Sequence, residues 1–221
     1  MIRADALNMP NSSRRALGEV RIRFARMPLP VRLYVSGRIF AFPPPFLDSY
    51  ILPTGVLASF GCGIGIMEAY LGLRYPSLRI DASDCDPRKI SIANDVAPPN
   101  VMFRVCDVIS DPFPAELPAI LFVDLLHHIP WESHDAVVAK SFSALQPGGR
   151  LIVKDLDTRP RWKQVWNWGQ DMIRSRGEPP HVRSLEEWRC LMERHAFEVA
   201  SFAIATWRPY AHVVLVGTKR T

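Results

Sequence analysis

The sequence predicts an α/β protein: a doubly wound sheet of about seven strands, mostly parallel, with helices on both faces and an antiparallel pair at its C-terminal end. From residue 55 onward, short apolar runs alternate with segments of helical period. Such alternation implies right-handed βαβ crossovers and a parallel sheet. Two later apolar runs, at 197–205 and 211–217, have a short connection, which indicates a hairpin. We therefore expect a domain at residues 55–221 and an N-terminal extension at residues 1–54.

The N-terminal extension is predicted to hold two helices. Apolar residues repeat with a helical period over 12–27, where Ser12 or Ser13 could cap the first turn. Prolines end this segment, and a second amphipathic segment follows over 31–42. Residues 1–11 show no period, so we expect no regular structure there.

Positive charge is concentrated in this extension. The chain has a net charge of +5, and residues 1–40 hold eight arginines against two acidic residues, while the remainder holds 19 basic and 20 acidic residues. Three interpretations remain open: a solvated face, a site for an anionic substrate group, or contact with an anionic membrane surface. A nucleic-acid partner is disfavoured because the main domain is slightly acidic.

The main domain is predicted to begin with five strands and the helices between them. The run at 119–124 is continuously apolar, as expected for a strand buried on both faces. After these elements, helices are predicted over 161–174 and from Ser184, which opens a capping-box sequence. The five strands are expected at 56–60, 78–83, 101–105, 119–124 and 150–154, and the helices between them at 66–74, 87–96 and 133–145.

A glycine-rich turn joins the first of these strands to its helix. Gly61, Gly63 and Gly65 allow the backbone to come close to a ligand, and Asp84, at the end of the next strand, could accept hydrogen bonds from ribose hydroxyls. A dinucleotide fingerprint would place glycine where Ile66 stands. The spacing therefore favours a nucleoside ligand without a phosphate and weakens an NAD-dependent alternative.

Six short motifs in this order resemble the class I S-adenosylmethionine-dependent methyltransferase family, over roughly residues 55–219. They are VLASFGCGIG at 56–65, DCDP at 84–87, CDV at 106–108, DLLHHI at 124–129, LQPGGRL at 145–151 and ERHAFEV at 193–199. The resemblance implies a Rossmann-like fold, S-adenosylmethionine as cofactor and S-adenosylhomocysteine as product. It implies that the cofactor-binding residues are Ser59, Phe60, Gly61, Cys62, Gly63, Asp84, Cys85, Asp107, Val108 and Asp124, with Asp107 reading the adenine amino group.

One position departs from the family pattern. Family members usually carry an acid two residues before the first glycine, where it helps to hold the methionine amino group, and this chain has Ser59 there. Weaker cofactor affinity, or help from Asp124, is one expected consequence. A non-catalytic relative with a regulatory or scaffold role is the alternative.

Catalytic candidates follow the fourth and fifth predicted strands. Ligands bind at the carboxyl ends of strands in open α/β sheets, and there the chain places His127, His128, Asp155 and Asp157. An oxygen or protonated nitrogen acceptor must lose a proton, and histidine titrates near neutral pH. We therefore expect His127 or His128 to be the base, with Asp155 as a further catalytic candidate.

The acceptor is predicted from aromatic residues expected to form a lid. Three tryptophans of the 161–174 segment and three phenylalanines of the extension would make a largely apolar wall: Trp162, Trp166, Trp168, Phe40, Phe42 and Phe46. This favours methyl transfer to an O or N atom of a small hydrophobic or aromatic acceptor, free or held by a carrier protein or membrane. An RNA or protein methyltransferase is the alternative, although 124–127 reads DLLH and not the NPPY type.

The remaining expectations concern location and partners. No apolar run approaches the ~20 residues that a membrane span needs, and no secretory signal opens the chain. The four cysteines are scattered without a CxxC pair, as is typical of free thiols in a reducing compartment. We expect a cytoplasmic protein with no metal site, with peripheral membrane contact and homodimer formation left open.

Overall fold

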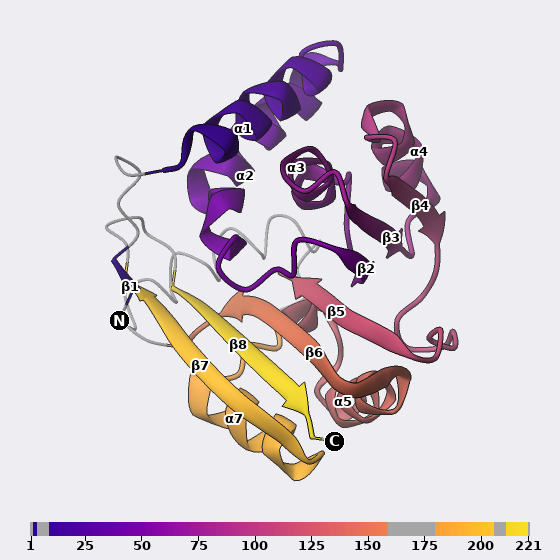
Figure 1. Ribbon diagram of the computed structural model, residues 1–221, viewed down its shortest axis with the longest axis vertical. Coiled ribbons are helices and arrows are strands. Elements are labelled where there is room, and N and C mark those ends of the chain that lie inside the picture. The colour runs from indigo at the N-terminus through magenta and orange to yellow at the C-terminus, as the bar shows by residue number, and fades with distance from the viewer. Residues whose placement is uncertain (1, 4–8, 159–179, 206–210, 221) are drawn as a thin grey trace. The chain divides into compact units, whose positions relative to one another are not determined.

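The computed structural model describes residues 2–3, 9–158, 180–205 and 211–220. The chain forms two compact units. The N-terminal unit is Asp5–Asp107, and the C-terminal unit combines Met1–Ala4 with Val108–Thr221. Strands alternate with helices between Gly55 and Val105, as the colour gradient of Figure 1 shows.

The N-terminal unit contains a parallel sheet in the order β2-β3-β4. Its strands are β2 (Gly55–Phe60), β3 (Leu78–Asp84) and β4 (Val101–Val105). The crossover helices α3 (Ile66–Arg74) and α4 (Pro87–Val96) have the predicted bounds. Parallel neighbours place the carboxyl ends of β2 and β3 together, and the glycine turn follows β2 directly.

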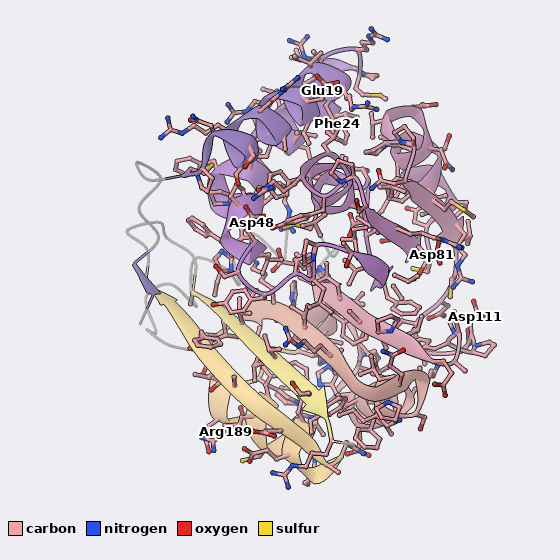
Figure 2. All side chains as sticks on the ribbon, viewed as in Figure 1. Glu19, Phe24, Asp48, Asp81, Asp111 and Arg189 are labelled. Atoms are coloured by element: carbon pink, nitrogen blue, oxygen red, sulfur yellow. The ribbon has the colours of Figure 1, made fainter. Side chains whose placement is uncertain are left out.

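Two helices of the extension belong to the same unit. They are α1 (Asn11–Phe24) and α2 (Leu29–Ala41), and α1 packs against α3. The buried face of α1 includes Leu17, Val20 and Phe24, and Phe24 is labelled in Figure 2. The predicted apolar face is therefore confirmed.

The predicted serine cap of α1 is wrong. The helix is preceded by Pro10, and no side chain caps its first turn. Ser13 is instead buried and donates a hydrogen bond to Asp48 (2.7 Å), which also accepts from the Tyr70 hydroxyl (2.8 Å). Asp48 follows a short 3-10 helix, η2 (Pro44–Leu47), and is labelled in Figure 2. This carboxylate fastens the extension to α3.

The C-terminal unit contains a mixed sheet in the order β1-β7-β8-β6-β5. β5 and β6 are parallel, while β8 pairs antiparallel with both β6 and β7, which confirms the predicted hairpin. Residues 2 and 3 pair parallel with β7, contrary to the expectation of no regular structure at the start of the chain. The strands are β1 (Ile2–Arg3), β5 (Leu117–Val123), β6 (Leu145–Leu156), β7 (Phe197–Ala205) and β8 (His212–Lys219).

The described part of this unit also contains two helices and a 3-10 turn. α5 (Trp131–Ala144) joins β5 to β6, and η3 (Leu126–His128) follows β5. α7 (Leu185–Arg194) begins with the predicted capping box at Ser184. β6 starts at Leu145, five residues earlier than expected, because Leu145 pairs with Leu117 beyond an irregularity in the ladder.

The predicted helix at 161–174 and its three tryptophans lie outside the described residues. Among the helices that are described, none is both long and apolar enough to cross a membrane.

Candidate cofactor and catalytic sites

The glycine turn after β2 adopts left-handed backbone conformations. The φ angles of Gly61, Gly63 and Gly65 are 70°, 58° and 78°. Side chains other than glycine rarely adopt this region. At Gly65 a Cβ would also lie 2.6 Å from the ring of Phe103, whereas at Gly63 it would meet nothing within 4 Å. Gly65 is therefore required for packing, and the backbone at Gly63 faces open space where a ligand can approach.

Asp84, at the end of β3, holds this turn in place. Its Oδ2 accepts a hydrogen bond from the Gly63 amide (2.9 Å), and its Oδ1 accepts from the Asp86 amide (2.9 Å). The Lys89 ammonium lies 3.6 Å from Oδ1. Asp84 does not cap α4, because Asp86 is the cap and accepts from the Arg88 amide. The structure thus places Asp84 beside the turn, and its ribose contact stays a prediction.

Ser59 forms a buried pair with a residue that the sequence reasoning missed. Its hydroxyl donates to Glu68 Oε1 at 2.6 Å, and both residues are 1% exposed. Glu68 lies in the first turn of α3. Within the described residues, its Oε2 accepts no hydrogen bond. The sequence feature that could have identified this pair is an acid nine positions after Ser59, in the first helical turn that follows the glycines.

Burial perturbs the titration of this region. Desolvation raises the pKa of Glu68 to about 7, and the nearby Asp84 carboxylate acts in the same direction. Burial also raises the pKa of the Cys62 and Cys85 thiols, so both stay protonated at neutral pH. These two cysteines are consistent with packing beside a ligand and not with thiolate chemistry.

The other predicted cofactor residues fall in both units. In the N-terminal unit, Phe60 is buried and Asp107 is half-buried just after β4. Val108 and Asp124 belong to the C-terminal unit, where Val108 is buried. Of the predicted aromatic wall, Phe42 and Phe46 pack edge to face at 5.5 Å, while Phe40 is 49% exposed.

Asp155 and His127 form the central pair of the C-terminal unit. Asp155 Oδ1 lies 2.5 Å from His127 Nδ1, and both side chains are buried. The residues stand at the carboxyl ends of β6 and β5, which are parallel neighbours. The sequence reasoning proposed them as separate candidates, and the structure brings them together.

Backbone amides fix the Asp155 carboxylate. Oδ2 accepts from the amides of Leu126 (3.0 Å) and His127 (3.3 Å), and Oδ1 accepts from its neighbour Leu156 (2.7 Å). These bonds hold η3 against β6. Asp155 thus orients both the imidazole and the backbone that carries it.

The other two catalytic candidates have different surroundings. His128 is exposed, with its ring 4.0 Å from that of His127. Asp157 Oδ1 accepts from the amides of Thr158 (2.7 Å) and Leu185 (3.3 Å), which ties the end of β6 to the start of α7. Asp155 therefore contacts His127, whereas Asp157 connects the end of β6 to the start of α7.

A second histidine, not identified from the sequence, supports η3. His134 is fully buried on α5, and its Nε2 lies 2.9 Å from the carbonyl oxygens of Leu126 and Ile129. Its Nδ1 accepts from Arg183 Nε at 2.9 Å, so Nε2 carries the proton and donates to those carbonyls. Burial lowers the pKa of His134, which keeps this imidazole neutral.

Asp124 pairs with Lys154, which is buried in β6. Asp124 has a φ of 52°, and its amide donates to the Lys154 carbonyl at 2.8 Å. Although the sequence shows no clustered set of metal ligands, ligand atoms of Asp124, His127 and Asp155 lie within 4.8 Å of one another. The Asp124 carboxylate pairs with the Lys154 ammonium, and Asp155 accepts hydrogen bonds from three backbone amides, so both carboxylates already have partners within the protein.

Comparison with known proteins shows that part of the chain is similar to methyltransferases. A methyltransferase-domain profile matches residues 58–149. The chain is 26% identical over 104 residues to trans-aconitate 2-methyltransferase of Paracidovorax citrulli (strain AAC00-1), covering 47% of this chain and 39% of that protein. It is 32% identical over 107 residues to ribosomal RNA small subunit methyltransferase C of Pseudomonas putida (strain GB-1), covering 45% of this chain and 32% of that protein. The chain thus spans well under half the length of these curated relatives.

Solved structures show the same fold. The chain superposes on an O-methyltransferase family 2 protein from Planctomyces limnophilus DSM 3776, crystallised with apigenin, with a TM-score of 0.67 and 23% identity. That match covers 92% of this chain and 64% of the other. Further structures of this fold include S-adenosylmethionine-dependent methyltransferases. The predicted Rossmann-like α/β fold, mostly parallel with antiparallel C-terminal strands, is confirmed.

Proposed function

We propose that this chain transfers a methyl group from S-adenosylmethionine to an O or N atom of a small hydrophobic or aromatic acceptor, because a methyltransferase-domain profile matches residues 58–149 and the fold resembles that of a solved S-adenosylmethionine-dependent methyltransferase. The observation that carries the acceptor chemistry is the Asp155–His127 pair. A carboxylate 2.5 Å from Nδ1 and held by three amides is the arrangement that prepares an imidazole to act as a base.

The residues of the N-terminal unit fit the cofactor. Gly63 offers backbone that faces open space, and Glu68 has a buried oxygen with no hydrogen-bond donor in the described chain. When bound, the cofactor supplies a methyl group activated by a sulfonium. In our proposal the turn at Gly61 to Gly65 cradles the cofactor, Asp84 contacts its ribose and Asp107 contacts its adenine.

His127 is proposed to take the acceptor's proton. Asp155 accepts a hydrogen bond from Nδ1–H and so fixes the tautomer in which Nε2 can receive a proton from a hydroxyl or an ammonium group. His134 holds the carbonyls of Leu126 and Ile129 on either side of His127, which limits the movement of the base. A base positioned in this way contributes a factor of roughly 10²–10⁴ to the rate.

An RNA acceptor is the second candidate, favoured by the match to the ribosomal RNA methyltransferase. The arginines of α1 and α2 could contact phosphates. The sequence DLLH at 124–127 and the Asp155–His127 base favour the small-molecule acceptor. Sequence reasoning also left open a non-catalytic relative, on the ground that Ser59 supplies no charge.

Two measurements test the proposed function. Calorimetric titration should show micromolar binding of S-adenosylmethionine and S-adenosylhomocysteine and no binding of NAD. Turnover should then be followed as S-adenosylhomocysteine release over a panel of phenols, aryl acids, small amines and purified small ribosomal subunits. Turnover with the ribosomal subunits alone would replace the small-molecule proposal, and binding without turnover on any acceptor would favour the non-catalytic relative.

A further inference from the structure

Glu68 is a buried acid beside the glycine turn, and its second oxygen has no hydrogen-bond partner among the residues that the structure describes. Oε1 accepts from Ser59, whereas Oε2 accepts no hydrogen bond within the described residues. A buried carboxylate costs several kcal/mol unless a donor or a cation satisfies it. The bond from Ser59 satisfies only one of the two oxygens. The arrangement therefore calls for a further donor on Oε2.

The surroundings of Glu68 indicate that this donor is a cation from a ligand. Within the described part of the chain, the charged or titratable groups that act on Glu68 or are acted on by it are Asp84 at the end of β3 and the Cys62 thiol in the turn. Neither group can neutralise a carboxylate. Lys89 pairs with Asp84 and is half exposed. Asp84, which acts on Glu68, accepts a hydrogen bond from the Gly63 amide, and a Cβ at Gly63 would meet nothing within 4 Å.

We propose that Glu68 binds the ammonium group of the cofactor's amino-acid tail through Oε2, while Ser59 holds Oε1. The usual acid at position 59 and its role are thereby replaced by a hydroxyl on β2 and a carboxylate on α3. This inference rests on the proposed function for the identity of the ligand. It also removes the reason for reading Ser59 as the mark of a lost site, because the negative charge is present nine residues later.

The test compares two ligands that differ in the amino-acid tail. S-adenosylhomocysteine carries the ammonium group, and 5′-methylthioadenosine retains the adenosine and the thioether without it. Calorimetry on the wild-type protein and Glu68→Gln should show S-adenosylhomocysteine affinity reduced roughly 10- to 100-fold in the variant, the loss expected for a charged hydrogen bond. The affinity for 5′-methylthioadenosine should change less than about twofold.

Glu132→Gln is the matched control. Glu132 also lies in the first turn of a helix, α5, but it is exposed, so this variant should bind both ligands like the wild type. Equal loss of both ligands in Glu68→Gln would overturn the proposal and assign Glu68 to the shape of the turn. Unchanged S-adenosylhomocysteine affinity in the variant would also overturn it.

A measurement on the wild-type protein alone covers the case in which Glu68→Gln does not fold. Only the ionised carboxylate can pair with an ammonium, and the pKa of Glu68 in the free protein is raised to about 7. S-adenosylhomocysteine affinity should therefore fall several-fold between pH 7.5 and pH 6, while 5′-methylthioadenosine affinity stays level. Parallel pH dependence for both ligands would contradict the assignment of Glu68. Binding of neither ligand at any pH would instead overturn the proposed function itself.

Discussion

Asp155 Oδ1 contacts His127 Nδ1 at 2.5 Å, although 28 residues separate them in the chain. Two adjacent parallel strands bring them together, because Val123 at the end of β5 pairs with Lys154 at the end of β6. The same carboxylate binds the amides of Leu126 and His127. The position of the proposed base is therefore set by the sheet and not by the loop alone.

The two neighbouring histidines should respond differently to substitution. His127→Ala should lower kcat by roughly 10²–10⁴ because the proposed proton acceptor is removed. His128→Ala should retain most of the activity, since His128 is exposed and Asp155 does not bind it. Steady-state kinetics over pH 6–9 with an accepted substrate checks both variants. Unchanged turnover in His127→Ala would exclude it as the base.

The Glu68 carboxylate should lower stability as pH rises. Its pKa is raised from 4.5 to about 7 in the folded protein, so the folded state binds more protons than the unfolded state between these values. The free energy of unfolding contributed by this group therefore decreases from pH 4.5 to pH 7 and stays low above pH 7. The free energy of unfolding of Glu68→Gln should therefore exceed that of the wild type. The difference should grow with pH over this range, up to about 3 kcal/mol.

Urea denaturation of the ligand-free protein at pH 5, 6, 7 and 8 measures this difference. Glu132→Gln again serves as the control, and its free energy of unfolding should differ from that of the wild type by the same amount at every pH. If the difference in free energy of unfolding between Glu68→Gln and the wild type does not vary with pH, burial does not raise the pKa of the Glu68 carboxyl.

The glycines of the turn should differ in their tolerance of alanine. Gly63→Ala adds only the strain of a positive φ, because its Cβ would meet nothing within 4 Å, and should cost roughly 1–2 kcal/mol. Gly65→Ala adds a clash with Phe103 at 2.6 Å and should cost a further ~1–3 kcal/mol. Thermal unfolding without ligand measures both. Equal costs would show that Phe103 moves aside freely.

Removing the buried ammonium of Lys154 should destabilise the C-terminal unit strongly. Lys154→Met removes the ammonium of a buried ion pair whose side chains are 0% and 6% exposed, and breaking such a pair costs roughly 3–5 kcal/mol. Adding Asp124→Asn should restore part of this loss, because asparagine removes the charge and tolerates the positive φ of 52°. A double-mutant cycle from urea denaturation gives the coupling. If the effects of the two substitutions on the free energy of unfolding are additive, the interaction between Asp124 and Lys154 contributes little to stability.

The sequence predicted local features well because they depend on neighbouring residues. The bounds of α3, α4 and β4 follow from hydrophobic period and from Pro87, and the glycine turn follows from its own composition. The early start of β6 was missed because its first pairing depends on Leu117 of another strand.

The site was harder to predict because it depends on long-range contacts. Asp155 and His127 were both identified, but only the register of β5 and β6 shows that they form one pair. Glu68 was overlooked because an acid in the first turn of a helix is common and stabilising in itself. Its bond to Ser59 becomes visible only when α3 is folded back along β2.

The pairing of Ile2 and Arg3 with β7 has a practical consequence for protein engineering. These two residues satisfy the main-chain groups of Ile204 and Ala205 along the outer side of the hairpin. A version of the protein trimmed to start at Met9 would leave those groups open, and a bare strand edge recruits other strands. Such a version should self-associate at high concentration, so affinity tags are better attached behind Thr221 than exchanged for the first residues.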